Sequence, residues 1–211
     1  SAIQFGGNQQ GSGSDREAVR LVVLLVLMIG WAGMAFPAGN TVGWGSNEWG
    51  ELGTGFSGNS STPQPVVVSL GALKDKTPIQ VSAGVDHTCA LTSNGRVACW
   101  GSGDFGQLGN GSTSDSSLPL AVNTNGVLAG KTVIQVSAGE NHTCALTSDG
   151  QVACWGDGSY GALGDGNSSD SFVPVAVNTS GVLAGKTVVQ VSAGYGYTCV
   201  RISNGKLACW G

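Results

Sequence analysis

Short apolar runs separated by glycine-rich and polar segments make up the chain from residue 40 to residue 211. In one representative unit these runs are residues 118–122, residues 133–137 and the two arms of residues 142–155. Brief runs bounded by Gly, Asn, Asp and Ser are typical of β-strands. The pattern therefore predicts an all-β fold with four short strands in each unit.

The units recur at a fixed period. Trp-Gly pairs begin at Trp44, Trp100, Trp155 and Trp210, with spacings of 56, 55 and 55 residues. Four-stranded units repeated at tens of residues indicate a β-propeller, in which each blade packs against its neighbours. We therefore predict a partial β-propeller of about three repeats of 55 residues over residues 40–211, preceded by an N-terminal hydrophobic helix.

A hairpin with one cysteine on each strand occurs three times. In the first copy, a three-residue loop ending at Gly95 places Cys89 opposite Cys99, within the range of a disulfide. A two-residue Asn-Gly loop would instead place Cys89 opposite Trp100. The same register in all copies predicts three disulfides: Cys89–Cys99, Cys144–Cys154 and Cys199–Cys209.

The distribution of the cysteines supports pairing. All 6 lie in the three hairpins, and the partial first unit around Val42–Gly45 has none. Zinc is the alternative, but this spacing differs from that of a zinc knuckle. Disulfides indicate an oxidising compartment.

The first 38 residues have a different character. Residues 1–17 are polar and predicted to be a disordered tail. An apolar run follows at Leu21–Phe36, within residues 18–38, with Arg16 and Arg20 before it. This segment is interpreted as an export signal peptide, as a retained membrane anchor, or as a buried core helix. The first two interpretations place the repeats outside the cytoplasm.

Composition excludes some functions. Charged residues make up 10% of the chain, the net charge is -4, and the few Lys and Arg residues are scattered. Binding of nucleic acid is therefore disfavoured. Because the chain begins with Ser1 and stops within a repeat at Gly211, we interpret it as a segment of a longer protein.

The stretch Val136–Gly164 resembles the repeat of the regulator of chromosome condensation (RCC1) family. The shared features are Val-x-Ala-Gly, a His before a strand, a turn Gly, Trp-Gly and Gly-x-Leu-Gly. The resemblance, to a secreted cysteine-containing type, implies a propeller of usually seven blades, so further blades are expected beyond Gly211. The family includes a secreted inhibitor of β-lactamases, which implies protein binding outside the cell.

No catalytic, metal-binding or cofactor-binding group is predicted. His87 and His142 occupy equivalent places in successive repeats, and Tyr197 takes that place in the third. A hydrogen-bonding role in the fold therefore suits them better than general-base catalysis. Likewise, the repeated Trp residues are predicted to pack between blades.

Arg201 is an exception within the hairpins. It takes the position of Leu91 and Leu146, on the face that the cysteines share. A buried and unpaired Arg would be costly. Either the third blade is less covered than the others, or Arg201 has an acceptor in a blade that is not part of this sequence.

The variable segments between strands are the predicted binding surface. Loops 46–62, 102–117 and 157–171 are rich in Ser, Asn, Asp and Gly. Their aromatic residues serve either packing or contact, and the full set of candidate residues is Trp49, Phe105, Tyr160, Asp104 and Asp157.

The sequence thus predicts a non-catalytic propeller that binds a protein partner, in the extracellular space, at the cell surface or in the periplasm. Nucleotide exchange on a small GTPase, implied by the namesake of the family, is the first alternative. A polysaccharide-active or glycan-binding propeller is the second.

Overall fold

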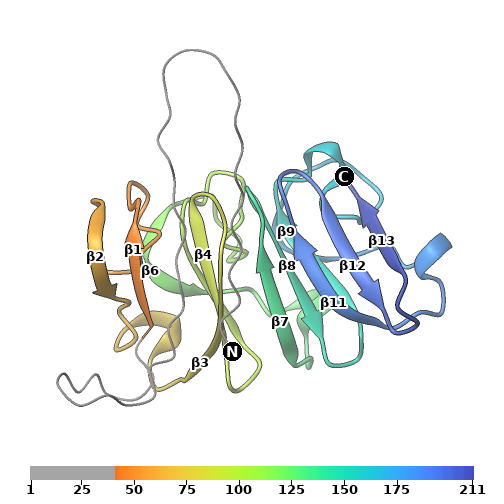
Figure 1. The fold of residues 1–211 in the computed structure, drawn as a ribbon, viewed down its shortest axis with the longest axis horizontal. Coiled ribbons are helices and arrows are strands. Elements are labelled where there is room, and N and C mark those ends of the chain that lie inside the picture. The colour runs from red at the N-terminus through yellow and green to blue at the C-terminus, as the bar shows by residue number, and fades with distance from the viewer. Residues whose placement is uncertain (1–40) are drawn as a thin grey trace, which may run out of the picture.

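The computed structural model describes residues 41–211, and the strands within them stand as neighbouring sheets (Figure 1). The first sheet pairs β1 with β2, and the next two have the orders β3-β4-β5-β6 and β10-β9-β8-β7. The last has the order β11-β12-β13. The strands are β1 (Val42–Gly45), β2 (Ser60–Pro65), β3 (Pro78–Ala83), β4 (His87–Thr92), β5 (Val97–Gly101), β6 (Ser116–Ala121), β7 (Val133–Ala138), β8 (His142–Thr147), β9 (Val152–Gly156), β10 (Ser171–Ala176), β11 (Val188–Ala193), β12 (Thr198–Ile202) and β13 (Leu207–Trp210).

These sheets are blades, and the predicted all-β propeller fold is confirmed. The blade of β3–β6 is the first blade below, that of β7–β10 the second and that of β11–β13 the third. Strands β3, β7 and β11 lie side by side across the blade boundaries, so they are the inner strands. The 3-10 helices are η1 (Gly71–Leu73), η2 (Gly126–Leu128), η3 (Ser159–Gly161) and η4 (Gly181–Leu183).

The predicted hairpin register is confirmed in each blade. Cys89 faces Cys99, and the N–H of Thr92 donates to the carbonyl of Arg96 across the three-residue loop. Gly95 closes this loop with φ 75°, a conformation that costs Gly little and other residues more. All three predicted disulfides are present, each with its Cα atoms 4.1 Å apart.

Side-chain hydrogen bonds fasten the inner strands to one another. The amide of Gln80 donates to the carbonyl of Val136 and accepts from its N–H, at 3.0 Å in both cases. The hydroxyl of Ser82 accepts from the N–H of Ala138. Gln135 and Ser137 repeat both contacts toward β11, so each blade offers its neighbour a copy of the same interface.

The hydrophobic core lies between blades as well as within them. Leu91 and Val97 of the first blade belong to one cluster with Trp155 and Ala145 of the second. The leucine of each Gly-x-Leu-Gly turn is almost completely buried in this boundary: Leu52, Leu108 and Leu163. Burial of this apolar surface is what makes successive blades cohere.

Some predicted boundaries were wrong. The strand expected at 118–122 is β6, which begins two residues earlier. Strands β2 and β10 also begin within the predicted ranges of their loops. The three loops are therefore shorter than predicted and span 46–59, 102–115 and 157–170. The connection 123–132 was expected to be irregular and contains η2. The tail 1–17 and the hydrophobic segment 18–38 lie outside the described residues. Residues 41–211 contain no helix of the length and apolar character that a membrane crossing demands.

Candidate protein-binding surface

The two ends of the strands form two different faces. Neighbouring strands within a blade are antiparallel, so their connections alternate between the ends. We call one end the loop face; it comprises loops 46–59, 102–115 and 157–170 with turns 84–86, 139–141 and 194–196. The other end, the hairpin face, comprises turns 93–96, 148–151 and 203–206 with connections 66–77, 122–132 and 177–187.

Each long loop is closed at its base by a side chain. Asp115 accepts a hydrogen bond from the N–H of Gly103 at 2.8 Å, and Asp170 accepts one from Gly158 at 3.0 Å. In the first loop, Asn59 accepts from the N–H of Asn47 in the same way. Such bonds hold the loop ends together without regular secondary structure.

The loops are also attached to the following blade. The N–H of Gly55 donates to the carbonyl of Ser117, and that of Gly111 donates to the carbonyl of Phe172. Loops fixed at both base and flank present their side chains in a defined arrangement, which lowers the entropic cost of binding.

The predicted loop aromatics all reach the surface. Trp49 is 40% exposed, Phe105 38% and Tyr160 81%. The N–H of Trp49 donates to the Glu51 side chain, and that of Phe105 donates to Gln107. The equivalent residue in the third loop, Ala162, offers no such acceptor. Tyr160 there adopts φ 61°, a left-handed conformation that is strained for a residue with a Cβ.

The two predicted loop carboxylates differ. Asp104 is exposed beside Phe105 in the sequence. Asp157 is partly buried, and its carboxylate accepts a hydrogen bond from the N–H of Ser159 at 2.7 Å. Asp104 is thus available for contact, whereas Asp157 also shapes its own loop.

Acidic residues gather at this end of the described structure. Among the residues that the structure describes, no Lys or Arg lies at the loop face. The acidic residues at this face are Glu48, Glu51, Asp86, Asp104, Asp115, Glu140, Asp157, Asp165 and Asp170.

Glu140 and Tyr195 were not predicted from the sequence. They occupy equivalent positions in turns 139–141 and 194–196, and the N–H of Glu140 donates to the carbonyl of Gly194. Burial raises the pKa of the Glu140 carboxyl, a hydrogen bond from the Tyr195 hydroxyl opposes this, and the charge of Asp157 adds to the increase. The turn position that holds Val85, Glu140 and Tyr195 differs in every blade, and that variation is the signal in the sequence that could have identified them.

The two histidines lie in the blade boundaries, away from the surface. His87 and His142 are each 1% exposed. Nε2 of His87 lies 2.8 Å from the hydroxyl of Thr143, whose own proton goes to the carbonyl of Gln107. Nε2 therefore donates, so the neutral form of this ring carries its proton on Nε2.

Burial keeps both rings neutral over most of the pH range. It lowers the pKa of His87 to about 3, with the neighbouring His142 adding to the effect, and that of His142 to about 4. An imidazole with so low a pKa is a weak base, and a buried ring is out of reach of a substrate in solvent, so neither histidine suits general-base catalysis.

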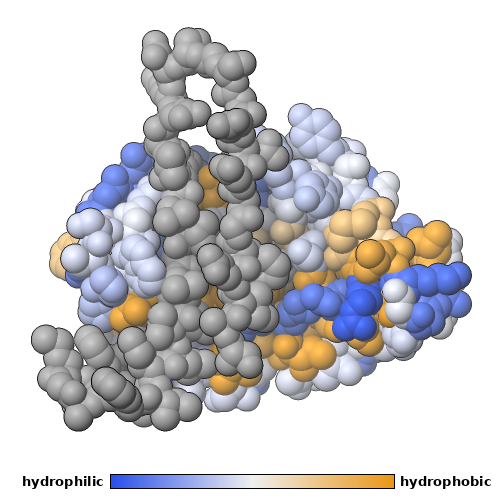
Figure 2. All heavy atoms as spheres, viewed as in Figure 1, coloured by the Kyte–Doolittle hydropathy of each residue, from blue (hydrophilic) through white to orange (hydrophobic). Residues whose placement is uncertain are grey.

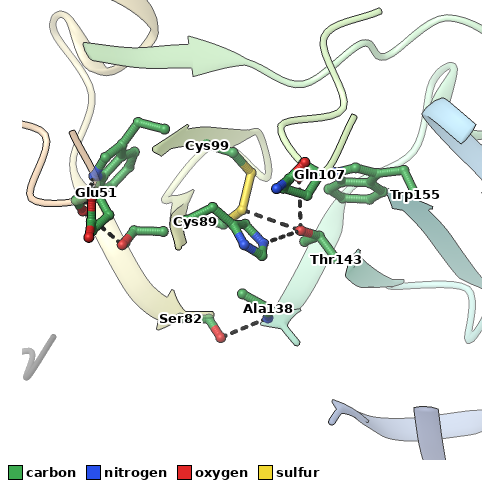
Figure 3. Close-up of a disulfide and its surroundings, with 11 residues drawn as sticks. Glu51, Ser82, Cys89, Cys99, Gln107, Ala138, Thr143 and Trp155 are labelled. Atoms are coloured by element: carbon green, nitrogen blue, oxygen red, sulfur yellow. Dashed lines mark hydrogen bonds between the residues drawn. A yellow bond between two sulfur atoms is a disulfide. The ribbon is translucent and has the colours of Figure 1, made fainter. Parts of the chain in front are cut away.

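The disulfides and the tryptophans complete this boundary (Figure 3). Sγ of Cys89 lies 3.8 Å from the hydroxyl of Thr143 in the next blade. The indole N–H of Trp155 donates to the same Gln107 carbonyl at 2.9 Å. The predicted packing of Trp100 and Trp155 between blades is confirmed, since both are at most 1% exposed.

The cysteines and acids form no metal site in the described part of the chain. No three His, Cys, Asp or Glu side chains come together between residues 41 and 211 as such a site would require. The cysteines there are all in disulfides.

Sequence profiles agree with the fold. Two profiles described as the regulator of chromosome condensation (RCC1) repeat match the chain. One matches residues 39–91, 94–146 and 149–201, and the other matches residues 79–107 and 133–162.

Curated relatives include the ultraviolet-B receptor UVR8 of Arabidopsis thaliana, 36% identical over 168 residues. That match covers 80% of this chain and 36% of UVR8. The human E3 ubiquitin-protein ligase HERC2 is 32% identical over 175 residues, which cover 82% of this chain and 4% of HERC2. The chain thus spans only a minor part of the length of these relatives.

Solved structures show the same architecture. Human WBSCR16 superposes with a TM-score of 0.71 at 25% identity, over 82% of this chain and 43% of that one. Prp20p of Saccharomyces cerevisiae superposes with a TM-score of 0.63 at 21% identity, over 74% of this chain and 38% of that one. Since the repeat profiles cover most of the chain, it belongs to the regulator of chromosome condensation (RCC1) repeat family.

Proposed function

We propose that this chain is part of a non-catalytic β-propeller that binds a protein partner through its loop face, outside the cytoplasm. In this account, further blades beyond Gly211 complete the ring. The contacts between the inner strands stabilise the fold. The loops 46–59, 102–115 and 157–170 contact the partner.

One observation supports this assignment above the others. The residues that could have served chemistry, namely the histidines, cysteines and buried tryptophans, are engaged in blade packing. The side chains left exposed at the loop face are aromatic rings and carboxylates on anchored loops. Aromatic residues are enriched at protein interfaces because they bury a large area at low entropic cost.

The chemistry of the loop face favours a partner with Lys or Arg at its surface. Carboxylates attract such cations over a distance and aromatic rings bind them at contact. Prp20p, whose structure shares this fold, has binding properties toward Gsp1p and histones, so a protein with this fold can bind proteins.

A location outside the cytoplasm is supported by two features of the chain. Each hairpin has its disulfide, and the apolar segment within 18–38 has the composition of an export signal or membrane anchor. Structural disulfides are rare in reducing compartments.

The experiment is a comparison of retained proteins. The complete chain is immobilised and exposed to extracellular material, and bound proteins are quantified by mass spectrometry. The loop variant carries Trp49→Ser, Phe105→Ser and Tyr160→Ser. A matched control removes exposed apolar side chains from the hairpin face, by Leu70→Ser and Val182→Ser.

We expect a protein that the wild type and the control retain equally and that the loop variant loses at least tenfold, a difference of about 1.4 kcal/mol in binding free energy. Retention should also weaken at high salt, because the attraction is electrostatic. If every retained protein binds the loop variant as well as the wild type, the loop face is not the binding surface.

A further inference from the structure

The hairpin face has the opposite charge to the loop face. Every Lys and Arg in the described residues lies at this face or, in one case, on a strand that leads to it. They are Lys74, Lys76, Arg96, Lys131, Lys186 and Lys206, with Arg201 on β12. Only Asp75 and Asp149 oppose them there, and Asp149 forms an ion pair with Lys131 at 2.6 Å.

Part of this charge repeats with the blades. Lys76, Lys131 and Lys186 are equivalent residues just before the inner strands. In each case the backbone N–H donates to the carbonyl of the leucine three residues earlier, in η1, η2 or η4. The lysines are therefore held in the same place in each blade.

The hairpin turns lie beside these lysines. The N–H of Ser93 donates to the carbonyl of Thr77, which follows Lys76, and the N–H of Ser203 donates to Thr187 in the same way. These bonds place Arg96 and Lys206, which end their turns, at the same rim as the repeated lysines.

An exposed aliphatic residue follows each of the repeated lysines by three residues in the sequence. Ile79, Ile134 and Val189 occupy equivalent positions and are 52%, 53% and 39% exposed. Each stands at an irregularity in the pairing of its inner strand, between Pro78 and Gln80 in the first blade. A bulge directs its extra side chain away from the core, which explains the exposure of an apolar residue here.

Figure 2 shows strongly hydrophobic and strongly hydrophilic surface side by side along the lower part of the molecule. A face that combines lysines with exposed aliphatic side chains matches the interface of an anionic bilayer. Lysines contact the headgroups while the aliphatic groups reach the acyl boundary. A nucleic-acid surface would instead be expected to offer stacking aromatics or bidentate arginines.

The path of the chain agrees with this orientation. Strand β1 is antiparallel to β2, which follows loop 46–59, so the Val42 end of β1 is at the hairpin face. The apolar run Leu21–Phe36 precedes that end by only a few residues in the sequence. A chain attached to a membrane by this run would thus present its hairpin face to the lipid.

We propose that the hairpin face, with its rim of Lys76, Arg96, Lys186 and Lys206 around the exposed aliphatic residues, docks on an anionic lipid surface. The acidic loop face then points away from the membrane toward its protein partner. This inference uses the surface-displayed form of the proposed function but does not depend on the loop-face partner.

The test measures binding of the complete chain to vesicles of phosphatidylcholine with or without phosphatidylglycerol. The charge variant carries Lys76→Gln, Arg96→Gln, Lys186→Gln and Lys206→Gln, all at exposed positions. The relocation variant adds lysines on the loop face at exposed sites, by Ser57→Lys, Thr113→Lys, Ser114→Lys and Ser168→Lys. It restores the net charge at the wrong end of the molecule.

We expect the charge variant to bind phosphatidylglycerol vesicles at least roughly tenfold more weakly than the wild type, with no recovery in the relocation variant. Residues 1–38 are the same in every variant, so their contribution cancels. Equal binding of all three proteins, or recovery on relocation, would overturn the proposal. So would binding of duplex DNA that depends on the four cations without any binding to vesicles.

A second readout reports which face touches the lipid. An environment-sensitive dye is placed at Ile134→Cys or, as the control, at Ser168→Cys; the described cysteines are all in disulfides, so the new thiol is labelled selectively. Fluorescence should rise on anionic vesicles only for the dye at residue 134. An equal response at both sites contradicts docking by the hairpin face. Because the loop variant of the partner experiment keeps the hairpin face, vesicle binding and partner retention can fail separately.

Discussion

The second and third blades share their cysteines, turn glycine and Trp-Gly pair but have different surroundings. Leu146 of the second blade is 1% exposed, whereas Arg201 at the equivalent position is exposed and bonds Gln190 of its own blade at 3.2 Å. Trp155 is fully buried, while Trp210 is only partly covered. The indole N–H of Trp210 still donates to the carbonyl of Ala162 at 3.0 Å, as that of Trp155 does to Gln107. The third blade thus keeps its contacts with the blade before it, and the described residues cover only that side.

The same contrast holds at the histidine position. His142 reaches the hydroxyl of Thr198 in the third blade at 2.9 Å. Tyr197, which replaces it one repeat later, is 51% exposed. Gln190, which matches the bridging residues Gln80 and Gln135, likewise bonds within its own blade. The third blade therefore differs from the second mainly on its uncovered side.

The largest single loss of stability should come from the tryptophan of the second blade. Trp155→Ala should cost about 4–5 kcal/mol, since it opens a cavity and leaves the Gln107 carbonyl without the indole donor. Trp210→Ala should cost about half as much, because that ring is already partly exposed. Urea unfolding of the two variants measures this, and equal losses would remove the distinction between the blades.

Leu146 and Arg201 occupy equivalent positions, and exchanging their identities should change the free energy of unfolding by very different amounts. Leu146→Arg places a charge in a buried site and should cost about 4 kcal/mol. Arg201→Leu should change stability by less than about 0.5 kcal/mol, because its position is exposed. Thermal or urea unfolding measures both. A costly Arg201→Leu would mean that Arg201 is an essential contact.

Acid should destabilise the second blade by protonating His142, whereas Tyr197 at the equivalent position of the third blade takes up no proton. The pKa of His142 is lowered to about 4, so the unfolded chain takes up a proton below about pH 6.5 and the folded chain does not. Stability is therefore lost as pH falls from about 6.5 to about 4, by about 3 kcal/mol for this group.

The control for this effect is His142→Gln, whose amide can still donate to Thr198. It should flatten the pH dependence of the unfolding free energy over that interval, while His87 continues to contribute. An unchanged slope would show that protonation of His142 does not oppose folding.

Among the changes in the second blade, loss of its disulfide should have the smallest effect. Cys144→Ala with Cys154→Ala should cost about 2.5 kcal/mol, from the loss of a short closed loop. The bond Cys199–Cys209 has one exposed and one partly buried cysteine, whereas the second-blade pair is 0% exposed. Mild reductant followed by mass mapping should therefore open the third-blade bond first. Simultaneous reduction would contradict the difference in cover.

The hairpins could be predicted from the sequence because their signals are local. The Gly95 loop sets the register, and the register sets the cysteine pairs. Within the described residues Arg201 is exposed and bonds Gln190 of its own blade. The alternative, an acceptor in a blade beyond Gly211, stays a prediction.

The blade boundary could not be predicted in the same way. Gln80 and Ser82 look like ordinary polar residues of a strand, and their bonds to Val136 and Ala138 arise only when two blades meet. Glu140 and Tyr195 come together across such a boundary too. Sequence spacing within one repeat holds no information on contacts that depend on the rotation between repeats.

The central claim is that the propeller works with all its hairpins crosslinked, outside the reducing cytoplasm. The most direct test isolates the protein from its native source, blocks thiols during lysis, denatures it without reductant and counts alkylated cysteines by mass spectrometry. The account predicts no reactive thiol and three intact bonds, Cys89–Cys99, Cys144–Cys154 and Cys199–Cys209. Alkylation of all 6 cysteines would contradict it and would favour a reducing compartment.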